Sequence, residues 1–133
     1  MALKVELKPN ERIIIGDAVI TNDNSRTRLY IEGNSPILRE RDIIRPEEAN
    51  SPSKRLYVIL QLMYLSKDPR EHHKAYFDLV SEIQSAAPST ASYFDAINQE
   101  ILNDSYYKAL KEAQKLIAYE EELVSNAQST ECV

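Results

Sequence analysis

The spacing of apolar residues changes once along the chain, between Pro46 and Pro52. Residues 3–8, with the sequence LKVELK, alternate apolar and charged side chains. Such an alternation places the apolar side chains on one face of a strand. After Pro52 the apolar residues recur at intervals of three and four, as on one side of a helix. This change of period predicts a β part followed by a helical part.

Five short strands are expected in the β part. The first covers the alternating residues 3–8. The others are expected between turn-forming stretches rich in Gly, Asn and Pro, at Arg12–Ile15, Ala18–Thr21, Thr27–Glu32 and from Ile37 to Glu40. Short strands at this spacing predict an antiparallel meander or a small barrel.

The first helix of the second part is expected at residues 56–65. This stretch, LYVILQLMYL, is apolar on nearly all sides, which is typical of a buried helix. Ser51 and Pro52 precede it, and a capping serine followed by proline favours a helix start. We therefore expect this helix at the centre of the helical part.

Three more helices are expected after it. The second runs from Pro69 to about Ala86, with Phe77 on its buried stripe. Ser89 and Asp104 are expected to cap the third and fourth helices, because short polar side chains accept hydrogen bonds from the first free N–H groups. Four helices joined by short loops indicate an antiparallel array.

These patterns predict an α+β protein. Residues 1–48 are expected to form a β domain, residues 49–124 a helical domain and residues 125–133 a flexible tail. A β domain this small is near the size that needs outside support for stability. We expect that support from the helical part, from a second copy of the chain, or from both.

Charge is spread unevenly over a chain with a net charge of −5. Residues 1–55 carry 10 Lys and Arg against 9 Asp and Glu, or +1, and residues 56–133 carry 6 against 12, or −6. A net charge of +1 is in itself an ordinary surface. Beside an acidic helical part, however, it would direct an anionic ligand toward the β part.

Motifs of catalysis and cofactor binding are not found in the sequence. It has no GxSxG, P-loop or GxGxxG motif, and its single cysteine, Cys132, allows no disulfide within the chain. The neighbours His72 and His73 would point about 100° apart on a helix, which disfavours a shared metal. We expect no enzyme activity, metal or cofactor. Without an apolar run of about 18 residues or a signal-peptide pattern, we expect a cytoplasmic protein that does not enter a membrane.

Four blocks of the sequence resemble the FlbT family of flagellin-expression regulators. In order, between residue 1 and about residue 120, they are LKVELKPNERIIIGDAVITN, RLYIEGNSPILRERDI, KRLYVILQLMYL with the following HHKAYF, and KALKEAQKLIAYE. The resemblance implies a post-transcriptional regulator that binds the untranslated leader of flagellin messenger RNA and alters its translation or stability. Whether it represses or activates is left open.

A shorter pattern resembles the carbon storage regulator (CsrA) family of small RNA-binding proteins. It consists of Glu11 before a β-branched run ending at residues 15–17 (IGD), the Asn-x-Pro at residues 34–36, and the charged segment RERDI at residues 39–43. The two chains of a carbon storage regulator exchange strands. The resemblance therefore implies a homodimer or higher oligomer, in agreement with the need of open strand edges for partners.

Candidate RNA-binding residues follow from this resemblance and from the arginines. In carbon storage regulators the first strand and the charged segment bind RNA, which implies Leu3, Lys4 and the segment from Arg39 to Asp42. Arg28 is added because it shares a strand face with Tyr30, and a guanidinium binds phosphate and stacks on bases. The predicted RNA-binding residues are Leu3, Lys4, Arg28, Arg39 and Arg41.

The charged segment departs from the carbon storage pattern. Aligned on Ile43, Arg39 stands at the histidine of that pattern, Glu40 at its arginine, and Arg41 one place later. Two interpretations stay open: a different binding mode, or a shared fold without that RNA site. We expect Arg39 and Arg41 to lie on the same face of an extended strand, so that both can reach one RNA backbone.

Two functional hypotheses follow. In the first, the β part binds flagellin leader RNA, which the arginine density of residues 12–45 favours. In the alternative, the acidic helical part binds flagellin or a FlaF-like partner protein and acts on flagellar assembly. The net charge of the chain favours this alternative, as does the apolar stretch of residues 56–65 if that helix is partly exposed.

Overall fold

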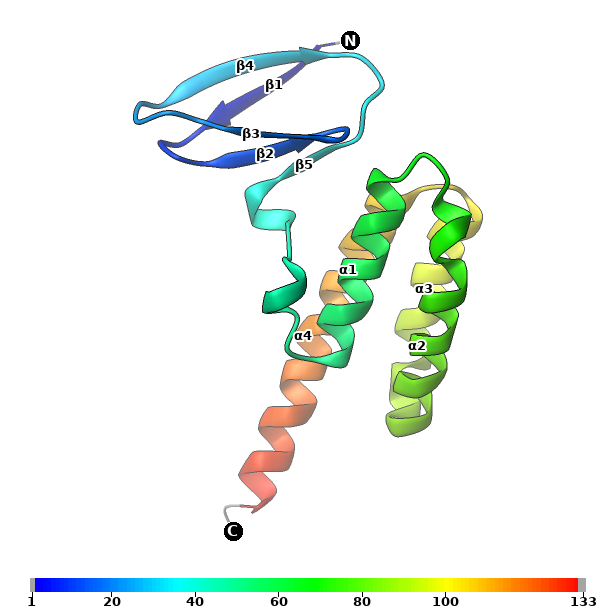
Figure 1. Ribbon diagram of the computed structural model, residues 1–133. Coiled ribbons are helices and arrows are strands. Elements are labelled where there is room, and N and C mark those ends of the chain that lie inside the picture. Colours follow the sequence, from blue (N-terminus) through cyan, green and yellow to red (C-terminus); the bar gives the residue numbers. More distant parts are fainter. Residues whose placement is uncertain (1, 132–133) are drawn as a thin grey trace. The chain divides into compact units, whose positions relative to one another are not determined.

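The computed structural model describes residues 2–131, with side chains up to residue 127. The chain divides into two compact units, Met1–Ile43 and Ile44–Val133. Strands make up the first unit and helices the second, which confirms the α+β class (Figure 1). The backbone of Ile44, at the start of the second unit, is hydrogen-bonded to Gln61 of the same unit. Among the described residues, no helix is both long and apolar enough to span a membrane.

The β unit holds five antiparallel strands in two small sheets. They are β1 (Ala2–Leu7), β2 (Arg12–Ile15), β3 (Ala18–Thr21), β4 (Thr27–Glu32) and β5 (Ile37–Arg39). β1 pairs with β4, and β2 lies between β3 and β5. Within residues 2–131, only β2 and β3 form a hairpin of consecutive strands, because β1 and β5 both pair with strands distant in sequence (Figure 1).

The core of the β unit is built from the alternating positions of its strands. Val5, Leu7 and Ile13 are fully buried, and the half-buried Ile15, Leu29, Ile31 and Ile37 pack around them. Gly16 opens the two-residue turn between β2 and β3 with a φ of 62°. A positive φ at this position is characteristic of type II′ turns, and glycine adopts it without a Cβ clash.

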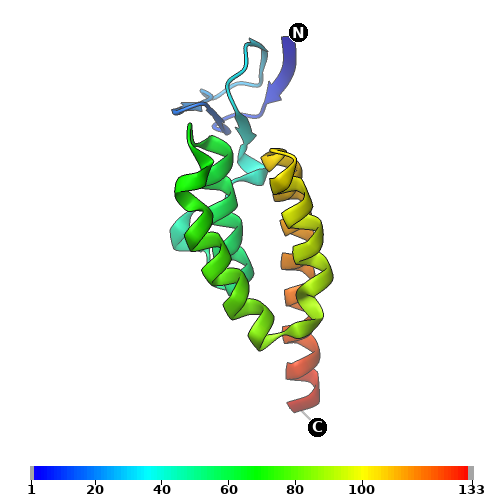
Figure 2. The ribbon, with the colours of Figure 1, turned by 90° about the vertical axis from the view of Figure 1, so that its right-hand side faces the viewer.

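Four α-helices form the second unit in the part of it that the structure describes, which ends at residue 131. They are α1 (Pro52–Leu65), α2 (His73–Ala86), α3 (Ala91–Leu102) and α4 (Tyr106–Glu131). α4 packs against both α1 and α3, and α1 also packs against α2 (Figures 1 and 2). Ser51 caps α1 as expected, since its hydroxyl accepts a hydrogen bond from the N–H of Lys54 at 3.3 Å.

The helical core is made of one stripe from each helix. Its buried apolar residues are Leu56, Tyr57, Leu60, Met63, Tyr76, Val80, Ile83, Phe94, Ile97, Ile101, Ala109, Leu110, Ala113 and Leu116. The prediction for Phe77 is wrong: this side chain is 48% exposed, while its neighbour Tyr76 is fully buried. Residues one position apart on a helix differ by about 100°, so a stripe that is centred on Tyr76 leaves Phe77 at its edge.

Three helix ends differ from the sequence prediction. Ser89 lies inside a 3₁₀ turn, Pro88–Thr90, and does not cap α3. Asp104 has a positive φ of 55° in the turn before α4, which is not the extended conformation of a capping residue. α4 continues to Glu131, so residues 125–131 are helical where a flexible tail is expected. Cys132 lies outside the described residues.

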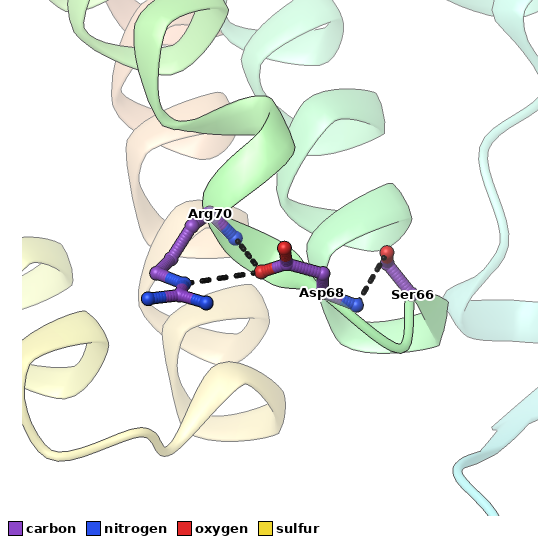
Figure 3. A network of polar contacts seen from close by, with 3 residues as sticks. All are labelled: Ser66, Asp68 and Arg70. Atoms are coloured by element: carbon purple, nitrogen blue, oxygen red, sulfur yellow. Dashed lines mark hydrogen bonds and ion pairs between the residues drawn. The ribbon is translucent and has the colours of Figure 1, made fainter.

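The corner between α1 and α2 is held by a short polar network (Figure 3). The hydroxyl of Ser66 accepts a hydrogen bond from the N–H of Asp68 at 3.2 Å. The Asp68 carboxylate accepts from both the backbone N–H of Arg70, at 3.3 Å, and its Nε, at 3.2 Å. The hydrogen bond from the Arg70 side chain lowers the pKa of Asp68. The network caps the 3₁₀ turn Pro69–His72 that leads into α2.

Candidate nucleic-acid interface

The outer face of the β1–β4 sheet presents charged and aromatic side chains. The strand register sets Lys4 directly opposite Tyr30, and Glu6 directly opposite Arg28. Their neighbours in sequence face the core, so these four side chains point to solvent. Tyr30 is 65% exposed. The face therefore combines an open aromatic ring with two cations and with the carboxylates of Glu6 and Glu32.

The two cations of this face differ in their partners. Arg28 Nη2 lies 3.2 Å from Glu6 Oε1, and both side chains are about half exposed. An exposed ion pair of this kind is typically worth under about 1 kcal/mol, so Arg28 can exchange Glu6 for a phosphate at little cost. Lys4 makes no ion pair with any side chain that the structure describes. It offers its ammonium group freely to an anion.

Arg39, of the other sheet, reaches the backbone of Glu6 in β1. It stands opposite Ile13 in the β2–β5 register, at the end of the core-facing row. Its Nη2 donates a hydrogen bond to the backbone carbonyl of Glu6 at 3.3 Å. Arg28 thus contacts the carboxylate of Glu6 and Arg39 its carbonyl. The fold brings these two predicted arginines to one residue of β1.

The expectation that Arg39 and Arg41 share a strand face is wrong. β5 ends at Arg39, and Glu40–Asp42 forms a 3₁₀ turn in which Arg41 is exposed and Asp42 buried. A 3₁₀ turn has three residues per turn, so residues two apart do not point the same way. Arg39 and Arg41 therefore do not share a face.

Leu3 and Lys4 lie on opposite faces of β1. It belongs to the core-facing row of β1, opposite Ile31, and is half exposed because it lies near the end of the strand. Lys4 is on the outer row. A single ligand lying on the outer face therefore contacts Lys4 and not Leu3.

Two residues of this face were not among the predicted sites. Glu6 is the common partner of Arg28 and Arg39, and Tyr30 is the ring opposite Lys4 and beside Arg28. The alternation of β4 places Tyr30 beside Arg28 already in the sequence. The sequence does not reveal that β1 pairs with β4 in a register that brings Lys4 opposite Tyr30.

The arrangement of these side chains suits a nucleic-acid strand with phosphates and unpaired bases. Lysine and arginine bind phosphate oxygens, and an exposed tyrosine offers a plane on which a base stacks. Among the described residues, no group of three His, Cys, Asp or Glu side chains is placed to hold a metal ion.

Net charge differs between the units. Residues 1–43 carry 7 basic and 7 acidic residues, and residues 44–133 carry 9 and 14, or −5.

These features define a two-unit α+β protein with a charged and aromatic surface on its β unit and an acidic helical unit. The chain belongs to the FlbT family, because the family model described as flagellar protein FlbT matches residues 3–124. No solved structure matches the chain.

Similar proteins carry names of flagellar regulators. The chain is 57% identical over 131 residues to the probable flagellum biosynthesis repressor protein FlbT 1 of Bradyrhizobium diazoefficiens, covering 98% of this chain and 90% of that protein. It is 47% identical to the probable repressor FlbT of Rhodopseudomonas palustris strain TIE-1, covering 94% and 99%. It is 30% identical to the flagellum biosynthesis repressor protein FlbT of Caulobacter vibrioides strain ATCC 19089, covering 97% and 94%.

Proposed function

We propose that this protein is a cytoplasmic post-transcriptional regulator of flagellin synthesis that binds the untranslated leader of flagellin messenger RNA. Binding would alter the translation or stability of that RNA, and the names of the relatives favour repression. The observation that carries the proposal is the exposed ring of Tyr30 opposite Lys4 and beside Arg28.

The three side chains have complementary tasks. Stacking of an unpaired base on an aromatic side chain contributes about 1–3 kcal/mol, and it tolerates different bases. Lys4 and Arg28 bind the phosphates on either side of the stacked base. Arg28 exchanges its weak pair with Glu6 for this contact. Arg39 and Arg41 are expected to add further phosphate contacts.

Titration of labelled leader RNA with the full chain tests the proposal, beside a scrambled RNA of equal length. Tyr30→Ala is expected to weaken leader binding roughly 5-fold to 150-fold, the equivalent of about 1–3 kcal/mol. Tyr30→Phe keeps the ring and is expected to bind like the wild type. Tyr107→Ala provides the matched control, because Tyr107 is an exposed tyrosine of the helical unit.

Two results would count against this function. Equal binding of the leader and the scrambled RNA by the wild-type chain would show that no specific site exists. Loss of binding in Tyr107→Ala but not in Tyr30→Ala would move the site to the helical unit.

Self-association is part of the proposal. Within the described residues β1 and β4 pair only with each other, which leaves an open edge on both strands. Open edges favour pairing with another chain. We expect a homodimer or higher oligomer with its β units in contact, and a monomer mass in ultracentrifugation at tens of micromolar would contradict this.

A protein partner is the second candidate function. Residues 44–133 carry a net charge of −5, and Leu62 of α1 is exposed despite its place in an apolar helix. Both features fit a helical unit that binds flagellin or a FlaF-like protein. In that case the effect on messenger RNA is indirect, and purified protein shows no preference for the leader.

A further inference from the structure

At one end of the helical unit, α4 extends beyond the helices that pack against it. α1 and α3 both begin level with residues 119–120 of α4: the N–H of Ser53 bonds to Glu120 at 3.1 Å, and the Tyr119 hydroxyl bonds to Ser89 at 2.7 Å. α4 nevertheless continues through residues 121–131, past the start of both neighbours (Figure 1). At about 1.5 Å per residue this overhang is roughly 16 Å long.

The apolar stripe of α4 continues onto the overhang. Leu116, which is fully buried, is followed seven residues later by the half-buried Leu123. Val124 is 52% exposed, and Ala127 lies on the same side of the helix. A helix without tertiary partners is marginal in water, and an amphipathic helix is stabilised mainly by covering its apolar side. The overhang therefore has an apolar surface without a cover among the described residues.

A cavity of about 240 Å³ opens at the same end of the unit. Its apolar lining comes from the start of α1 and the end of α2, namely Pro52, Ile83, Ala86 and Ala87. Two carboxylates, Glu82 and Glu120, complete the lining. Neither lysine nor arginine lines it. A long side chain with an apolar stem and a cationic end matches this lining.

The charge around this end points to a basic occupant. Glu121 is exposed and flanks the apolar stripe, one position from Glu120 of the cavity. One oxygen of Glu120 accepts the Ser53 N–H, which leaves its other oxygen for a ligand. A cation on the occupant would meet Glu82, Glu120 and Glu121, whereas a second acidic surface would be repelled.

We propose that this end of the helical unit binds an amphipathic helical segment of a partner protein, rich in Lys or Arg beside an apolar stripe. The apolar stripe covers Leu123, Val124 and Ala127, and one cationic side chain enters the cavity between Glu82 and Glu120. The surface lies wholly within the helical unit and is independent of RNA binding at the β unit.

A designed peptide serves as the probe. It has about 15 residues, with leucines at helical spacing and lysines beside them. One comparison peptide replaces every lysine by glutamate, and another keeps the composition but moves the leucines off the stripe. With the full chain, the basic amphipathic peptide is expected to bind at least about tenfold more tightly than either comparison peptide. The amide resonances of Ala86, Ala87 and Val124 are expected to shift in its NMR titration.

A matched pair of variants localises the site. Glu82→Lys with Glu121→Lys reverses two exposed charges at this end and is expected to weaken peptide binding at least about tenfold. Glu71→Lys with Glu100→Lys makes the same change of charge at the opposite end of the helices, before α2 and near the end of α3, and is expected to bind as the wild type does. The two double variants are expected to bind leader RNA with equal affinity. Equal RNA binding separates this site from the RNA site.

Three results would overturn the proposal. The first is equal binding of all three peptides, and the second is an equal loss of binding in both double variants. The third is self-association of the full chain, if the variant Val124→Glu abolishes it. A second copy of the chain, and not a partner protein, would then cover the overhang.

Discussion

The side-chain amide of Gln61 holds the backbone of Ile44 through two hydrogen bonds. Its Oε1 accepts from the Ile44 N–H at 3.0 Å, and its Nε2 donates to the Ile44 carbonyl at 3.1 Å. Gln61 is only 7% exposed, in the middle of α1. The single polar residue of the stretch LYVILQLMYL therefore secures the point at which the chain enters the helical unit.

Replacing this amide should destabilise the helical unit. Gln61→Leu keeps the approximate size but leaves both backbone groups of Ile44 without these partners, so we expect a loss of about 1–3 kcal/mol in the free energy of unfolding. Urea denaturation followed by circular dichroism measures the change. Gln99→Leu, on the exposed side of α3, is the matched control and should have little effect. An unchanged unfolding midpoint in Gln61→Leu would contradict the prediction.

The buried Tyr76 should make the helical unit sensitive to alkaline pH. Burial raises the pKa of Tyr76 above its ordinary value of 10, and its hydroxyl donates to Asn98 Oδ1 at 2.6 Å. The native state thus keeps this proton at a pH at which the unfolded chain has lost it. The stabilisation is complete below about pH 10 and decreases as the pH rises above that value.

Tyr76→Phe tests this pH dependence. Without the hydrogen bond to Asn98, the variant should be about 1 kcal/mol less stable than the wild type near pH 8. It has no proton to lose at this position, so the difference should shrink as the pH is raised above about 10. Urea unfolding at a series of pH values gives both curves. A constant difference at every pH would show that Tyr76 does not carry the effect, and Tyr30→Phe on the exposed β face is the control.

Arg39 and Arg41 should behave differently in leader binding. Arg41 is exposed, so Arg41→Ala should leave stability unchanged and reduce the log–log salt slope of leader binding by about 0.7 if it contacts one phosphate. Arg39→Ala also removes the hydrogen bond to the Glu6 carbonyl, so it should in addition cost about 0.5–1.5 kcal/mol of stability. Leader titrations at several salt concentrations, together with urea denaturation, separate the two.

Lys108→Ala is the control for this pair, because Lys108 is an exposed cation of α4 in the acidic unit. A salt slope that falls in Lys108→Ala and stays at the wild-type value in both arginine variants would place the RNA on the helical unit.

Local patterns in the sequence determined which segments are strands and which are helices. The ranges of β2, β3 and β4 agree with those predicted from the turn-forming stretches between them, and α1 begins at Pro52 after its capping serine. The faces of β4 also follow from the sequence alone, with Tyr30 beside Arg28. These features depend on residues that are close in sequence, where a period of two or a capping side chain acts directly on the backbone.

The tertiary structure decided which residues meet across long distances in sequence. The pairing of Lys4 with Tyr30, the two contacts of Glu6 with arginines, and the hold of Gln61 on Ile44 depend on strand register and helix packing. The exposure of Phe77 likewise depends on where the neighbouring helices lie. Periodicity shows which face of an element is apolar, but it leaves the partner of that face open. The candidate RNA face and the uncovered end of α4 could therefore be located only in the folded chain.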